Sequence, residues 1–271
     1  MKKSQVAILV ISLLSIGALY SLPRVVVDNE ADNTGLESAS ETGPAVEDLH
    51  DAVMTVASRQ QLDMLLSRLG LEENKENYIK LADSIAKLYQ ESGKFDSAAH
   101  YLGMSAERFS DPQGWEKAGV AYYDAYSFAL NEQKQAFLAE QTRNYLNKVL
   151  EKDPNRLDLK TKVAMTYVSS ANPMQGITML REILEEDPTN EEGLYHMGVL
   201  SLQSGQYKRA AERFEELVKY HPDNIQGQFY LGVSYFESKQ NNKAKKQFQL
   251  VQSMTKDPMV LASVEGYLDR I

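Results

Sequence analysis

A strict repeat in the second half of this 271-residue chain most constrains how it can fold. Small and aromatic residues recur there at a step of 34 positions, in the pairs Gly198 and Gly232, Ala210 and Ala244, and Phe214 and Phe248. Three prolines keep the same step: Pro154, Pro188 and Pro222. A fixed period of this length is typical of repeat proteins, in which each unit is too small to bury its own apolar face. The units must therefore stack to form one continuous core.

The repeat extends over most of the chain and predicts an all-α protein. We assign five units, which span residues 79–112, 113–156, 157–190, 191–224 and 225–258. The second unit contains about eleven extra residues, close to three helical turns, so its two helices can lengthen into a long hairpin with their faces in phase. Helical periodicity predicts a leading segment over residues 47–78, and residues 259–271 predict a single capping helix. The predicted fold class is an α-solenoid of about five helical hairpins.

The units 191–224 and 225–258 share a pattern of large and small residues. It consists of Leu194, Met197, Gly198, Ala210, Phe214 and Pro222 in the first unit, and of Leu231, Gly232, Tyr235, Ala244 and Phe248 in the second. This pattern resembles the tetratricopeptide repeat (TPR), and the resemblance covers residues 79–271. It implies two antiparallel helices per unit, with small residues where helices cross. The residues at these crossings are Ala86, Ala98, Gly119, Ala164, Gly198, Ala210, Gly232 and Ala244.

The N-terminus predicts attachment to a membrane. Lys2 and Lys3 precede an uncharged apolar run from Val6 to Leu22, which as a helix would span about 26 Å of a bilayer core of roughly 30 Å. We expect residues 1–23 to be a signal-anchor, with a cleaved signal peptide as the alternative. The two lysines favour a cytoplasmic N-terminus, which places the repeats outside the cytoplasmic membrane, in the periplasm of a Gram-negative cell. Residues 24–46 are polar and acidic and predict a disordered linker.

Composition and missing motifs argue against several classes of function. The net charge of −9 argues against nucleic-acid binding, and the absence of cysteine excludes disulfides and thiolate chemistry. The four histidines are far apart in sequence, so we expect no metal site. The sequence contains no Gly-rich phosphate loop, no His-Glu-x-x-His motif and no nucleophile elbow. We therefore expect neither an enzyme nor a bound cofactor.

The resemblance implies a groove lined by the first helix of each unit. The residues at the corresponding positions of the last three units are apolar: Met165, Val168, Tyr195, Val199, Leu202, Phe229, Val233 and Phe236. Such a surface is suited to an amphipathic helix or an extended apolar peptide. Alternatively, these side chains pack against the neighbouring repeat or the capping helix. The equivalent positions of the first two units are more polar and include Asp83, Lys87, Gln90, Glu116, Tyr123 and Asp124.

These features predict a non-enzymatic scaffold of the cell envelope that binds a protein partner in its groove. Tyr195 and Val199 occupy the positions where TPR domains that clamp an acidic chaperone C-terminus need Lys and Asn, so we expect no clamp of that type. The alternative is a homo-oligomeric structural protein that associates through the same apolar surface or through the aromatic hairpin Tyr122–Tyr145.

Overall fold

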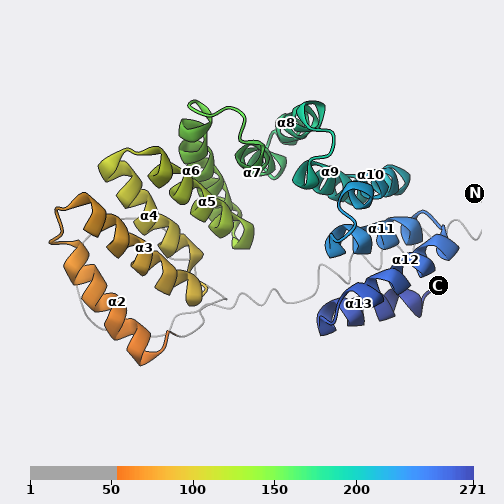
Figure 1. The fold of residues 1–271 in the computed structure, drawn as a ribbon, viewed down its shortest axis with the longest axis horizontal. Coiled ribbons are helices and arrows are strands. Elements are labelled where there is room, and N and C mark those ends of the chain that lie inside the picture. Colours follow the sequence, from red (N-terminus) through yellow and green to blue (C-terminus); the bar gives the residue numbers. More distant parts are fainter. Residues whose placement is uncertain (1–53) are drawn as a thin grey trace, which may run out of the picture. The chain divides into compact units, whose positions relative to one another are not determined.

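The computed structural model describes residues 54–271, which contain twelve α-helices and no strand (Figure 1). The predicted signal-anchor, the linker and the beginning of the leading segment lie outside these residues. None of the helices in the described range is both long and apolar enough to cross a bilayer. The all-α repeat fold predicted from the sequence is confirmed.

A single helix, α2 (Val56–Leu69), precedes five helical hairpins (Figure 1). The hairpins are α3 (Lys75–Glu91) with α4 (Phe95–Phe109), α5 (Pro112–Phe128) with α6 (Glu132–Leu150), α7 (Leu157–Val168) with α8 (Pro173–Glu186), α9 (Glu191–Gln203) with α10 (Tyr207–Tyr220), and α11 (Ile225–Glu237) with α12 (Asn241–Met254). The last helix, α13 (Pro258–Leu268), packs against α11 and α12. Each helix from α2 to α12 contacts the next one along the chain, so the core consists of a row of small apolar clusters.

Short polar side chains begin many of these helices. The side-chain oxygens of Asn190 and Asn224 accept hydrogen bonds from the backbone N–H groups of Gly193 and Gly227, at 2.9 and 2.6 Å. These caps satisfy donors that would otherwise lack a partner at a helix start. Equivalent positions in two successive repeats thus start their first helices in the same way.

Close crossings between helices explain the small residues of the repeat. All eight residues predicted at crossings are buried. A Cβ atom added to Gly119 would lie 2.4 Å from Leu146 Cδ2, and one added to Gly198 would lie 2.7 Å from the ring of Phe214. Helices can approach to about 8–10 Å only if such positions carry small side chains. The repeat period therefore reflects the packing of each helix pair.

The second hairpin differs from the others in length and composition. Its helices α5 and α6 contain 17 and 19 residues, compared with 13 and 14 in the hairpin of α9 and α10. The extra residues predicted from the sequence thus lie in longer helices. Tyr122 and Tyr145 are buried between them and stack with ring centroids 5.6 Å apart.

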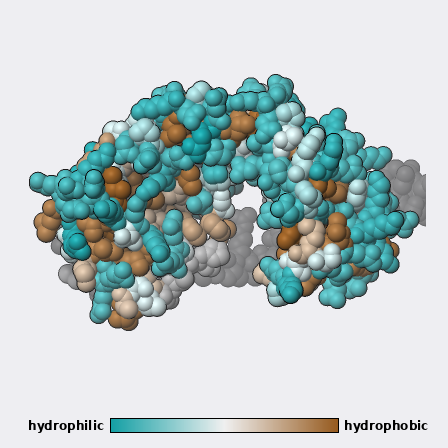
Figure 2. All heavy atoms as spheres, viewed as in Figure 1, coloured by the Kyte–Doolittle hydropathy of each residue, from teal (hydrophilic) through white to brown (hydrophobic). Residues whose placement is uncertain are grey.

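On the face drawn in Figure 2, hydrophilic residues predominate over the described chain, and hydrophobic ones form small patches.

Candidate functional site

The C-terminal part of the predicted groove lies beneath α13. The ring of Phe236 is 5.3 Å from that of Tyr267, and the Phe236 side chain is only 9% exposed. The ring centre of Phe229 is 5.9 Å from that of Tyr267. Val233 is buried in the apolar cluster that contains these residues. These three residues therefore pack against the capping helix. The sequence analysis gave this packing as the alternative to an open groove.

The remaining groove residues, Met165, Val168, Tyr195, Val199 and Leu202, are half-buried. They lie on two neighbouring first helices, α7 and α9. Tyr195, Val199 and Leu202 pack at the edge of the apolar cluster formed by α9–α13, and Met165 and Val168 pack at the edge of the cluster formed by α7–α9. The apolar surface that stays accessible is therefore smaller than predicted and centred on α7 and α9.

A polar cluster around Lys162 lies beside this surface. The Nζ atom of Lys162 is 3.8 Å from Glu192 Oε1 and 5.6 Å from the centre of the Tyr123 ring. Burial, followed by the charge of Lys162, lowers the pKa of His196 to about 4, so this imidazole is neutral near pH 7. Burial raises the pKa of Asp124, and Lys162 partly opposes that effect. The lysine thus links helices α5, α7 and α9 through charge.

The charged residues of the first two units are largely paired with one another. Lys117 Nζ lies 2.7 Å from Asp83 Oδ2. The guanidinium of Arg156 donates hydrogen bonds to both carboxylate oxygens of Glu116, at 2.7 and 3.0 Å, and also to Asp158. A cavity of about 560 Å³ lies against Asp83 and Glu116, but their carboxylates already have basic partners within the chain. This region is therefore less suited to bind a charged ligand.

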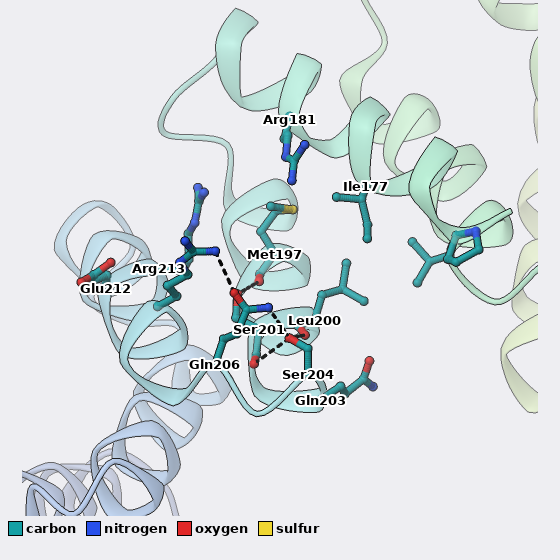
Figure 3. Close-up of a pocket in the computed structure, with 13 residues that line it drawn as sticks. Ile177, Arg181, Met197, Leu200, Ser201, Gln203, Ser204, Gln206, Glu212 and Arg213 are labelled. Atoms are coloured by element: carbon teal, nitrogen blue, oxygen red, sulfur yellow. Dashed lines mark hydrogen bonds between the residues drawn. The ribbon is translucent and has the colours of Figure 1, made fainter.

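A second cavity, of about 550 Å³, lies between the hairpins α7–α8 and α9–α10 (Figure 3). Three arginines line it, Arg181 from α8 and Arg209 and Arg213 from α10. Its other lining residues are Val168, Pro173, Ile177, Met197, Leu200, Ser201, Gln203, Ser204, Gln206 and Glu212. The cavity thus combines an apolar wall with several hydrogen-bond donors and an excess of positive charge.

None of the three arginines makes an ion pair among the described residues 54–271. Arg209 donates a hydrogen bond to Gln206 Oε1 at 2.8 Å, whereas Arg181 and Arg213 have no hydrogen bond or ion pair among residues 54–271. Arg209 and Arg213 are four residues apart on α10, a spacing at which like charges destabilise a helix by about 0.2–0.5 kcal/mol. The two charges are therefore retained at a small cost in stability.

The sequence did not single out these arginines or Lys162. The one available signal is the arginine pair on α10, because unpaired like charges at that spacing are unfavourable. Among residues 54–271 the structure also contains no cluster of three or more His, Asp or Glu side chains that could hold a metal ion.

Comparisons with known proteins agree with this architecture. Residues 201–263 match the family model of the tetratricopeptide repeat. The structure is similar to that of a tetratricopeptide repeat protein from Parabacteroides merdae, with a TM-score of 0.57 and 15% identity over 78% of each chain. It is also similar to TTC0263, a thermophilic TPR protein of Thermus thermophilus, with a TM-score of 0.52 and 13% identity over 72% of this chain and 99% of that one. No curated protein matches the sequence. These findings establish the helical repeat fold and support a tetratricopeptide repeat protein.

Proposed function

We propose that this chain is a non-enzymatic scaffold that binds a helix or extended peptide of a partner protein along α7 and α9. The observation that carries the proposal is the half-buried apolar surface of Met165, Val168, Tyr195, Val199 and Leu202. On α11 the equivalent Val233 and Phe236 are buried in the cluster that includes α13, whereas all five residues on α7 and α9 are only half-buried. Accessible apolar surface on neighbouring helices is a common way to bind an amphipathic segment.

Site-specific photo-crosslinking in cells tests this proposal. A photoreactive amino acid is placed in the full-length chain at Val199 or Met165, and in a control chain at Leu250, which is 44% exposed on α12. We expect a discrete adduct from the two groove positions and none from Leu250. The same adducts from all three positions, or none from any, would contradict binding at α7 and α9.

Self-association is the second candidate function, because large apolar side chains are exposed around the connection of α5 and α6. Phe128, Leu130 and Phe137 are 59%, 73% and 55% exposed. Light scattering of the purified full-length chain distinguishes the two functions. A dimer that dissociates when Leu130 and Phe137 are replaced by serine favours self-association, and a monomer favours the scaffold.

We also propose that the repeats act outside the cytoplasmic membrane, held there by the apolar run Val6–Leu22. Its length and the preceding Lys2 and Lys3 support this location. Alkaline phosphatase fused after Ile271 should be active in the intact chain and inactive when residues 2–23 are deleted. Equal activity in both fusions would contradict export through this segment.

A further inference from the structure

We propose that the cavity between the hairpins α7–α8 and α9–α10 binds an acidic segment of the partner protein. Carboxylates of that segment pair with Arg181, Arg209 and Arg213, and a neighbouring aliphatic side chain packs on the apolar wall. The inference rests on the proposed function in taking the ligand to be a protein segment.

The charge of the cavity selects an anion. The residues that line the cavity include three arginines and only one acidic residue, Glu212. Arg181 and Arg213 have no acidic partner in the described chain, unlike Arg156, which is held by two carboxylates. Guanidinium groups bind carboxylates through paired N–H···O bonds, and such charge-assisted bonds are stronger than neutral ones. An incoming carboxylate would therefore supply the partner that these arginines lack.

The apolar wall indicates a peptide instead of a small inorganic anion. Ile177, Met197 and Leu200 line the cavity together with the arginines (Figure 3). Phosphate or sulfate would leave this surface unused, whereas a segment that alternates acidic and aliphatic residues would cover both parts.

Val168 connects the cavity to the proposed groove. It lines the cavity and also belongs to the half-buried surface of α7. A partner bound along α7 and α9 can therefore extend past the end of α7 at Val168 and place acidic residues in the cavity. This arrangement gives one partner two points of contact, one apolar and one charged.

The test uses a fluorescein-labelled synthetic peptide, acetyl-Glu-Leu-Asp-Glu-Leu-Asp-Glu, and a matched peptide in which Gln and Asn replace the acidic residues. Binding to the full-length chain is followed by fluorescence anisotropy. We expect the acidic peptide to bind and the amide peptide to bind at least about tenfold more weakly. The double variant Arg181→Gln, Arg213→Gln should bind the acidic peptide about tenfold more weakly or worse. Arg59→Gln, on the exposed surface of α2, should leave the affinity unchanged.

Several outcomes would overturn the inference. They are an absence of binding, equal affinity for the two peptides, and equal weakening by Arg59→Gln. Displacement of the peptide by excess inorganic phosphate, with no loss of affinity in Ile177→Ser, would show a general anion site instead. Circular dichroism of each variant controls for folding.

This test and that of the proposed function fail independently. Crosslinks at Val199 without peptide binding would retain the groove and reject the acidic ligand. Peptide binding that depends on the arginines, without crosslinks at Val199 or Met165, would retain the cavity and reject the groove.

Discussion

The first helices of the N-terminal repeats, α3, α5 and α7, contact one another through ion pairs, whereas α9, α11 and α13 contact one another through aromatic rings. Asp83 of α3 pairs with Lys117 of α5, and Glu116 of α5 pairs with Arg156 at the start of α7. At the other end, the aromatic contacts are Tyr195 with Tyr230, at 5.9 Å, and Phe236 with Tyr267, at 5.3 Å.

This difference has energetic consequences. Partly exposed ion pairs stabilise a protein by about 0–1 kcal/mol and are screened by salt, whereas a buried aromatic side chain contributes several times more. We therefore expect the contacts between α3, α5 and α7 to depend more on ionic strength than those between α9, α11 and α13. The two kinds of contact meet at α7 and α9, where the accessible apolar surface and the arginine-lined cavity both lie.

The largest expected effect is the loss of an aromatic ring at the C-terminal end. Phe248 is fully buried, and its ring lies 5.0 Å from that of Tyr267. Phe248→Ala should lower the free energy of unfolding by about 3–5 kcal/mol, because the cavity left behind cannot close completely. Leu250→Ala, on the exposed side of the same helix, should change it by about 0.5 kcal/mol or less. Urea unfolding followed by circular dichroism compares the two, and similar midpoints would contradict the aromatic core.

The next effect is a loss of stability with decreasing pH at the polar cluster of α7 and α9. Burial lowers the pKa of His196 from 6.5 to about 4 in the folded chain. Between these values the unfolded chain binds the proton that the folded chain does not, so stability falls as pH falls. The shift corresponds to up to about 3 kcal/mol, an upper value since the side chain is only half-buried. Urea midpoints at several pH values between 4 and 6.5 measure the slope.

His196→Gln and Asp124→Asn separate the contributions to this slope. The first should flatten the dependence of stability on pH over the window. Asp124 acts in the opposite sense, because its raised pKa lets the folded chain bind a proton more readily as pH falls. Asp124→Asn should therefore steepen the loss. If stability depended on pH equally steeply in His196→Gln, His196 would not be the group responsible for this dependence.

The repeat period predicts the hairpins because the requirement behind it is local. A small residue at a crossing, such as Gly198 against Phe214, is needed wherever two helices of one unit meet, and it therefore recurs at a fixed step along the sequence. The greater length of α5 and α6 can also be predicted, because extra residues keep the apolar faces of both helices in phase only if they add whole helical turns. These features need no knowledge of how distant repeats meet.

The accessible surface depends on contacts that a single repeat does not encode. Val199 and Val233 occupy the same position in successive units, yet Val199 is half-buried and Val233 is buried in the cluster beside α13. The arginines of the cavity occupy different positions of their units, so no period reveals them. The sequence could therefore predict the positions of the groove residues within each repeat, but not which of these residues α13 covers.

A third effect compares two glycines of the C-terminal helices. A Cβ atom at Gly232 would lie 2.7 Å from the buried ring of Phe248, whereas one at Gly266 would meet nothing within 4 Å. Overpacking costs about 1–3 kcal/mol, and alanine regains up to about 1 kcal/mol of helix propensity. Gly232→Ala should thus destabilise the chain by about 1–2 kcal/mol, and Gly266→Ala should stabilise it by about 0.5–1 kcal/mol. Thermal unfolding measures both, and shifts of the same sign would contradict close packing at Gly232.

The smallest effect concerns the ion pairs of the N-terminal repeats. Both side chains of the pair Asp83–Lys117 are more than a third exposed, so Lys117→Met should cost less than about 1 kcal/mol. In about 1 M salt the Debye length falls to about 3 Å, and the difference from the unaltered chain should vanish. Phe248→Ala, at the other end, should keep its full effect at the same salt concentration because that contact carries no charge. Urea midpoints at low and high salt provide the comparison. If the cost of Lys117→Met persisted in high salt, the contact would depend on packing of the lysine stem, and the contrast between the two ends would be one of degree.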